Sequence, residues 1–401
     1  MKKITGSVTA PQGFLAQGVY ADIKKKDKKD VALIYSQVPC TAAGTFTTNV
    51  VRAACVDISR QHLANGQAQA IVVNSGNANA CTGEQGWHDA LQMAKITAQC
   101  LNIDPHDVLV ASTGVIGVLL CMDKIEKGIK TAAAQLSPDG SHNAAQAIMT
   151  TDLVSKEIAV EIELQGKPVR IGAIAKGSGM IHPNMATMLA FFTTDAAIDS
   201  KCLDKAFRAA VDQSFNMVSV DRDTSTNDMA LILANGLAGN PLINNPDSED
   251  YQVFQEALQE VAIALAKMIA RDGEGATRMI EVRVIEAPSQ ATARQIARSI
   301  TGSNLAKAAV FGQDANWGRI LAAAGYSGAV FDPNRVDIYL GKEKMAENGV
   351  GLSFDEDRAR QELDKDPVVI TVNLKSGNEM AVAWGCDLSY DYVKINASYR
   401  S

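Results

Sequence analysis

The 401-residue chain lacks long apolar runs, long basic tracts and closely spaced cysteine pairs. No stretch approaches the ~18–20 apolar residues that a membrane-spanning helix needs. The net charge is −7, from 38 basic and 45 acidic side chains, and no basic tract is long enough to follow a nucleic-acid backbone. Seven scattered cysteines, an odd number, fit a disulfide scaffold poorly. These absences predict a cytoplasmic protein with reduced thiols and without membrane or nucleic-acid partners.

The signature motifs of several enzyme classes are absent as well. The chain has no GxxxxGK[ST] phosphate loop, no GxGxxG opening a helix, no HExxH and no GxSxG. Its five histidines share no metal-ligand spacing, so we expect no metal site. We interpret His182, next to Pro183, as an exposed loop residue in preference to a catalytic base. Two aspartates interrupt the densest charged run, residues 24–30, which predicts a solvated hairpin tip.

Apolar patterning predicts alternating strands and helices over the first two thirds of the chain. Buried strands are expected at 31–35 and 70–73, and helices at 88–101 and 252–271. The pattern then changes, and we place a domain boundary near residues 273–279.

Beyond this boundary the sequence predicts a smaller unit of mixed structure. A strand is expected at 280–284, followed by a helix that Ser289 can cap. Residues 312–324 indicate a turn and another helix. Apolar alternation at 368–374 and 380–384, on either side of a turn, predicts a β-hairpin.

The most informative segment is 176–195, in which three turn formers precede Ala186-Thr187 and a buried strand follows. Such a turn can present the Thr187 hydroxyl at the mouth of the strand. A threonine hydroxyl is a poor nucleophile until a base takes its proton. Cleavage of the Ala186–Thr187 bond would free an α-amine, with an ordinary pKa near ~7.7–8, to be that base. From spacing alone, a loop-to-strand junction with a capping threonine is the alternative.

Several further strings accompany this threonine, and together they carry a family resemblance. They lie at residues 74–83, 112–117, 149–152, 223–228, 271–277, 311–319, 384–387 and 399–401. In this order, and with the segment 176–195, the chain resembles the ornithine acetyltransferase family of arginine biosynthesis, the ArgJ proteins. The resemblance extends along essentially the whole chain.

The resemblance implies a fold and a domain organisation. The fold is an α/β/β/α sandwich of the N-terminal-nucleophile class, of the DmpA and ArgJ type, with a smaller α+β domain at the C-terminus. We assign residues 1–275 to the catalytic domain and residues 276–401 to the C-terminal domain.

The resemblance also implies a self-cleaving precursor and a reaction. Thr187 would cut the Ala186–Thr187 bond, giving an α chain of residues 1–186 and a β chain of residues 187–401 that assemble as an (αβ)₂ heterotetramer. The implied reaction moves an acetyl group from N-acetylornithine to glutamate through an acetyl-threonine intermediate, without organic cofactor or metal. Some members also use acetyl-CoA as donor, and the sequence leaves that second activity open.

Residue roles follow from the resemblance position by position. Thr187 is the expected nucleophile, and Thr113 and Gly114 are the expected oxyanion hole. Lys176 suits a carboxylate and Glu274 an ammonium by charge sign. The full set of expected substrate contacts is Thr150, Lys176, Thr187, Glu274, Asn396 and Ser401. Taken singly, Lys176 and Glu274 would be surface charges and Thr113-Gly114 an ordinary turn, and Thr151 competes with its neighbour Thr150.

The chain departs from the family pattern at two places. Residues 221–223 read Asp-Arg-Asp where many members have a central glycine, which predicts an altered loop near the start of the β chain. Ala397-Ser398 stands where Ala-Asp is common.

The alternative enzyme is an N-terminal-threonine aminopeptidase or amidase, in which water replaces glutamate. The alternative of another class is a non-catalytic homologue that senses an amino acid.

Overall fold

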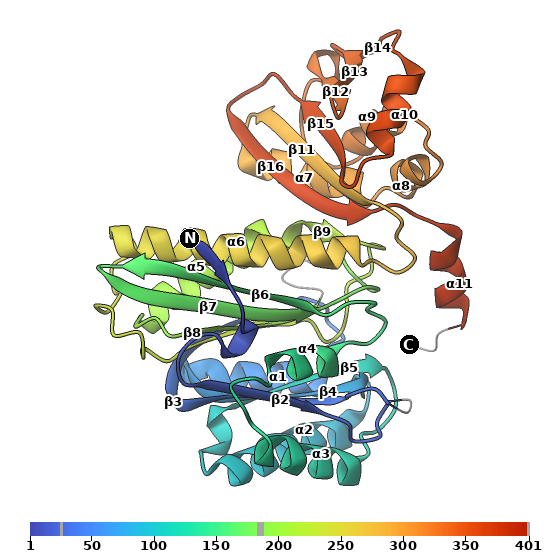
Figure 1. The fold of residues 1–401 in the computed structure, drawn as a ribbon. Coiled ribbons are helices and arrows are strands. Elements are labelled where there is room, and N and C mark those ends of the chain that lie inside the picture. The colour runs from blue at the N-terminus through green and yellow to red at the C-terminus, as the bar shows by residue number, and fades with distance from the viewer. Residues whose placement is uncertain (25–26, 183–187, 399–401) are drawn as a thin grey trace.

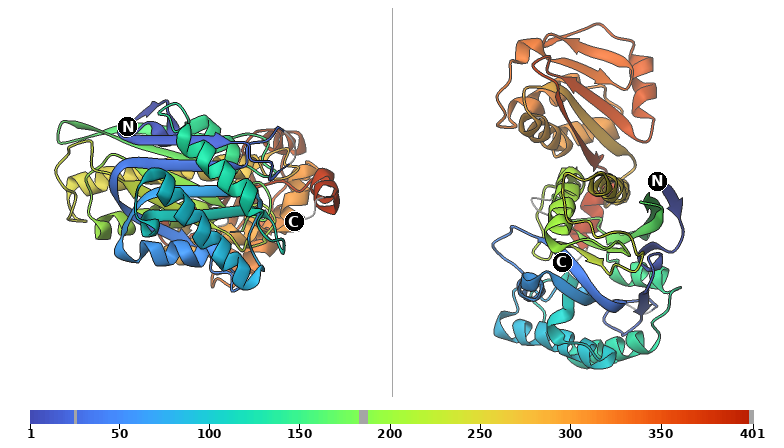
Figure 2. Two further views of the ribbon diagram at one scale, coloured as in Figure 1. Left: turned by 90° about the horizontal axis from the view of Figure 1, so that it is seen from below. Right: turned by 90° about the vertical axis from the view of Figure 1, so that its left-hand side faces the viewer.

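A computed structural model describes residues 1–24, 27–182 and 188–398, so Ala186, Thr187 and Ser401 lie outside the described residues. The described chain forms two β-sheets and eleven α-helices (Figures 1 and 2). The first sheet has the order β1 (Lys2–Ile4), β6 (Lys156–Leu164), β7 (Lys167–Lys176), β8 (Leu189–Thr194), β10 (Met229–Ala234), β3 (Val31–Phe46), β4 (Gln67–Asn77) and β5 (Val108–Val115), with β2 (Phe14–Val19) paired to β3.

This sheet bends back on itself, so that β6, β7 and β8 lie above β2, β3 and β4 in Figure 1. Helices cover the two outer faces. On one side lie α5 and α6, and on the other α1, α2 and α3, with α4 packed on β2 and β3. The bounds are α1 (Ala54–His62), α2 (Gly83–Leu101), α3 (Met122–Ala134), α4 (Ser141–Ile148), α5 (Ser200–Gln213) and α6 (Glu249–Arg271). This order of layers confirms the predicted α/β/β/α sandwich.

The apolar run of β8 shows why the strand is buried on both faces. Successive strand side chains point to opposite sides of a sheet. Phe192 therefore packs with α5 in one hydrophobic core, against Phe207, while its neighbour Phe191 packs in the core that β3, β4 and β5 share. Both rings are fully buried. The two cores consequently meet across β8, the strand that begins two residues after the predicted nucleophile.

The second sheet lies at the other end of the molecule (Figure 1). Its order is β14 (Val350–Gly351), β13 (Glu343–Glu347), β12 (Asp337–Leu340), β15 (Val368–Asn373), β11 (Met279–Ala287), β16 (Glu379–Cys386) and β9 (Val218–Ser219). Around it are α7 (Gln290–Thr301), α8 (Asn304–Phe311), α9 (Trp317–Gly325) and α10 (Glu356–Leu363). The last helix, α11 (Tyr390–Ser398), lies apart from this sheet in Figure 1. The long helix α6 contacts both sheets. The division at residue 275 stays a prediction, and β9 joins the second sheet from the first part of the chain.

The predicted hairpin of residues 368–384 is wrong in its pairing. Both strands exist, as β15 and β16, but β11 lies between them, parallel to β15 and antiparallel to β16. The connection of residues 374–378 is long enough to cross the width of one strand, because adjacent strands lie about 4.8 Å apart and each residue spans about 3.3 Å. Turn residues alone therefore do not show which strands pair.

Other local predictions are confirmed, with one correction in the charged run. Strands at 31–35 and 70–73 lie within β3 and β4, and the predicted helices lie within α2 and α6. Ser289 caps α7 by accepting a hydrogen bond from the Thr292 amide. Residues 20–30 do connect the antiparallel strands β2 and β3, but Asp30 at the end of the run is fully buried. Its carboxylate accepts hydrogen bonds from the backbone of the same loop, which explains the burial.

Candidate active site

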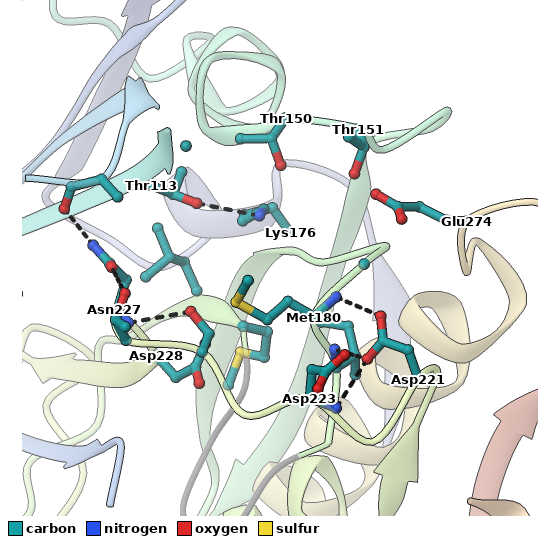
Figure 3. A pocket seen from close by; sticks show the side chains of 18 of the residues that line it. Thr113, Thr150, Thr151, Lys176, Met180, Asp221, Asp223, Asn227, Asp228 and Glu274 are labelled. Carbon is teal, nitrogen blue, oxygen red and sulfur yellow. Dashed lines mark hydrogen bonds between the residues drawn. The ribbon is translucent and has the colours of Figure 1, made fainter. Parts of the chain in front are cut away.

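Six residues singled out in the sequence line one pocket, which has a volume of about 250 Å³ (Figure 3). It forms where β5 and β7 end and where β8 and β10 begin. The six are Thr113, Gly114, Thr150, Lys176, Glu274 and Asn396. Met188, which follows Thr187 in the chain, also lines the pocket. The structure thus brings together residues from six separate segments of the sequence.

Gly114 occupies a position that only glycine fits. Its φ is +132°, in the region that favours glycine, and a Cβ atom there would lie 2.3 Å from the carbonyl carbon of Gly76. The close approach accompanies a bulge, at which Asn77 of β4 opposes both Thr113 and Val115 of β5. Thr113 and Gly114, at this bulge, both line the pocket.

Lys176, the last residue of β7, is buried in the pocket wall with 8% of its surface exposed. Its Nζ donates a hydrogen bond of 3.3 Å to Thr113 Oγ1 (Figure 3). Burial lowers the pKa of the Lys176 ammonium, an effect that the nearby carboxylate of Asp152 opposes. The prediction from single residues, a surface lysine, is therefore wrong.

Glu274 reaches the pocket from the loop after α6 and is also buried, with 7% exposed. A Cβ atom on Gly179 would lie 2.4 Å from the Glu274 carboxylate, so the glycine makes room for it. Asn396 in α11 donates a hydrogen bond of 2.8 Å from Nδ2 to Glu274 Oε2. The C-terminal helix thus returns to the catalytic part of the chain (Figure 1).

A buried ion network holds three of these segments together. Lys156 Nζ lies 2.7 Å from Asp152 Oδ1 and 2.6 Å from Asp272 Oδ2, and the side chains of Lys156 and Asp152 are inaccessible to solvent. Burial disfavours the charged form of Asp152, but Lys156 and Lys176 outweigh it and lower the pKa of the carboxyl to about 2. Asp152 follows Thr150 and Thr151, both of which line the pocket, so the structure leaves the two threonines equally eligible.

The chain is anchored on both sides of residues 183–187. Before this segment, Asp221 accepts hydrogen bonds from the amides of Met180 and Ile181, at 2.7 and 2.8 Å. After it, Met188 accepts a hydrogen bond from the amide of Met229 in β10. The predicted cleavage bond itself falls within 183–187, outside the described residues.

Asp228 is a pocket residue that the sequence analysis missed. It is 3% exposed, and its Oδ2 has no hydrogen-bond partner among the described residues. Burial raises the pKa of this carboxyl well above its ordinary value, although Ser225 and Lys176 act in the opposite direction. The string at 223–228 did draw attention to this loop. Its position directly before the buried strand β10 was the available signal for an inward-facing carboxylate.

The charged side chains of the pocket are of both signs, so they can face both an ammonium and a carboxylate group of a small ligand. Of the described residues that line it, Lys176 is basic and four are acidic, namely Asp221, Asp223, Asp228 and Glu274 (Figure 3). In the described ranges, no group of three or more His, Cys, Asp or Glu side chains is placed to hold a metal ion. Among the helices that the structure describes, none is long and apolar enough to cross a membrane.

Comparisons with known proteins agree with the resemblance seen in the sequence. The model of the ArgJ family matches residues 15–401. The arginine biosynthesis bifunctional protein ArgJ of Symbiobacterium thermophilum is 59% identical over 403 residues, and that of Caldanaerobacter subterraneus subsp. tengcongensis 53% over 405 residues, each match covering 100% of both chains. The crystal structure of the protein of that name from Bacillus halodurans is similar with a TM-score of 0.52 and 48% identity, over 53% of this chain and 100% of that chain. The chain therefore belongs to the ArgJ family, the acetyltransferase family of arginine biosynthesis.

Proposed function

We propose that this protein cleaves itself between Ala186 and Thr187 and then transfers an acetyl group from N-acetylornithine to glutamate through Thr187. The gathering of Thr113, Gly114 and Lys176 in one pocket, with Met188 at its wall, carries this proposal. Family membership supports the same reaction class. Water as acceptor, in an aminopeptidase or amidase, remains the alternative for the test below.

The first half-reaction would use groups at the pocket in defined roles. Thr187 Oγ attacks the acetyl carbonyl carbon while the α-amine of the same residue takes the hydroxyl proton. The charge that develops on the carbonyl oxygen is stabilised by donors at Thr113 and Gly114, worth about 2.7–4 kcal/mol for one such donor. The C–N bond then breaks, and the leaving amine of ornithine takes the proton.

The second half-reaction reverses the first with a new amine. The amino group of glutamate attacks the carbonyl carbon of the acetyl-threonine ester and passes a proton to the Thr187 amine. The ester C–O bond then breaks, Thr187 Oγ takes up that proton, and N-acetylglutamate leaves. The charges of the pocket support amino acid substrates, with Lys176 facing a carboxylate and Glu274, held by Asn396, facing an ammonium. Ser401 remains a predicted contact outside the described residues.

The proposal extends to a second donor and to assembly. Relatives bear the name bifunctional, which supports acetyl-CoA as an additional donor for glutamate here. We further propose two α chains, residues 1–186, and two β chains, residues 187–401, in an (αβ)₂ heterotetramer without organic cofactor or metal. Seven free thiols suit the proposed cytoplasmic location.

Intact-mass spectrometry with N-terminal sequencing, on wild type beside Thr187→Ala, tests the self-cleavage. We expect two wild-type chains, the second beginning Thr-Met-Leu-Ala, and one uncut chain for the variant. A single uncut wild-type chain would contradict the proposal.

Initial-rate kinetics with both substrates then test the transfer. Parallel double-reciprocal lines are expected, because a covalent intermediate separates two half-reactions. Release of acetate at the same rate without glutamate would identify a hydrolase instead.

A further inference from the structure

A second cavity, of about 380 Å³, lies behind one wall of the active-site pocket. The wall consists of residues 181–182 and 221–223. Asp221 and Asp223 line the active-site pocket, whereas Arg222, between them, lines the second cavity. The same alternation separates Ile181 from His182. At both places, therefore, two residues that are neighbours in the sequence line different cavities.

Three arginines converge on the second cavity. Arg294 and Arg298 extend from α7, and Arg222 comes from the wall. Positions i and i+4 are neighbours on a helix surface, so two like charges there destabilise the helix. The carboxylate of Asp212 lies 3.6 Å from Arg294 and also acts electrostatically on Arg298. Three guanidinium groups therefore line one small cavity.

The pKa of His182 is affected by the positive charges around this cavity. It is half-buried, which corrects the sequence expectation of an exposed loop residue, and its Nδ1 is 2.9 Å from Ser219 Oγ. Its Nε2 lies 3.4 Å from a guanidinium nitrogen of Arg298. Burial, and then the charges of Arg298, Arg222 and Lys307, lower the pKa of His182 to about 4. The imidazole is therefore neutral at physiological pH and adds no charge of its own.

Arg222 adopts an unfavourable backbone conformation to reach the cavity. Its φ is +70°, where a residue other than glycine is strained. Its aliphatic stem is packed against α7, because a Cβ atom on Gly302 would lie 3.1 Å from Arg222 Cγ. Strain of this kind persists where the surrounding structure imposes it and concentrates at functional sites.

We propose that this arginine cavity, formed by Arg222, Arg294 and Arg298, binds a phosphate-bearing anion. The planar fork of a guanidinium matches two oxygens of a phosphate, and several guanidiniums together suit a diphosphate. A bound anion relieves the repulsion along α7 and compensates for the conformation of Arg222. The exposed ring of Tyr326, at the rim of the cavity, offers a stacking surface for a base.

The phosphates have two candidate sources, free inorganic anions and coenzyme A. The site stands whether or not the acetyl-transfer proposal holds, and only the coenzyme A source rests on that proposal. Isothermal titration calorimetry on the wild-type protein, with pyrophosphate and separately with coenzyme A, distinguishes the two. The affinity for either ligand is expected to fall as the salt concentration rises.

Two variants alter the arginine cavity: the double substitution of Arg294→Gln with Arg298→Gln, and Arg222→Gly alone. Arg358→Gln is the control. Glycine suits the φ of residue 222, so this variant removes a charge and keeps the fold. Arg358 lies on α10 with 72% of its side chain exposed, away from the arginine cavity. We expect dissociation constants at least roughly tenfold weaker for the pair, weaker for Arg222→Gly, and unchanged for the control.

Each outcome decides the proposal. Weaker binding of both ligands in the cavity variants supports the site with coenzyme A as the source. Weaker binding of pyrophosphate alone supports the site for free phosphate. Absence of wild-type binding, or equal affinities in wild type and in both cavity variants, overturns it.

Discussion

Gly114 combines two constraints that a side chain would violate, a positive φ and a close approach to Gly76. Gly114→Ala is expected to lower the free energy of unfolding by about 2–3 kcal/mol and kcat by about 10²–10³, because the oxyanion donors move. Urea denaturation and steady-state kinetics measure the two effects. Gly117→Ala is the control, since Gly117 also has a positive φ but nothing within 4 Å of a new Cβ. Equal losses in both variants would show that the close approach of Gly114 to Gly76 does not cause the effect.

Asp228 presents a trade-off between stability and activity. Its raised pKa means that the folded protein holds this proton to a higher pH than the unfolded chain does, so the carboxyl destabilises the fold progressively as pH rises above about 4. Asp228→Asn removes that cost and is expected to raise the melting temperature at pH 7.5 while lowering activity. The gain should shrink as the pH falls toward 4. A variant with a lower melting temperature at pH 7.5 would contradict this account.

The segments that carry the site depend on the buried network of Lys156, Asp152 and Asp272 rather than on their own conformations. Lys156→Met leaves two buried carboxylates without their cation, so we expect a loss of about 3–5 kcal/mol in unfolding free energy. Lys130→Met is the matched control, because Lys130 pairs with Glu126 in an exposed helical pair worth about 0.3–0.5 kcal/mol. Chemical denaturation of both variants distinguishes buried from exposed pairing.

The same network predicts an acid dependence. The pKa of Asp152 is lowered from 3.8 to about 2, so its stabilising contribution, on the order of 2 kcal/mol, is complete above pH 3.8 and is lost as the pH falls toward 2. The unfolding free energy of Lys156→Met should therefore show a weaker pH dependence than wild type between pH 4 and pH 2. Parallel pH profiles would exclude Asp152 as the titrating group.

Helix α11 connects the C-terminal part of the chain to the pocket. No α11 side chain is fully buried, yet Asn396 holds Glu274 and Tyr392 lines the pocket. Deletion of residues 390–401 is expected to lower kcat/KM at least about tenfold, because Glu274 loses a hydrogen bond. The unfolding free energy should change by less than about 1 kcal/mol. Val393→Ser, an exposed change on the same helix, serves as control, and a large loss of stability on deletion would refute this assignment.

Much of the molecule was predictable from neighbouring residues in the sequence. The strand at 70–73, the helix at 252–271 and the cap at Ser289 each follow from periodicity or from a side chain that reaches three residues along the chain. The family strings also identified Thr113, Lys176 and Glu274 before any geometry was known. These features depend on local chemistry, which the order of residues contains directly.

Other features needed the folded chain, because they depend on contacts between distant segments. The insertion of β11 between β15 and β16 is a matter of long-range pairing, which the turn residues at 375–379 do not specify. Asn396 meets Glu274 across 122 positions, and the burial that shifts the pKa of Lys176 and Asp228 arises from several elements packed together. The family strings in the sequence predicted which residues carry the chemistry of this protein. Tertiary packing decided how they are held, since distance and desolvation exist only once the layers close.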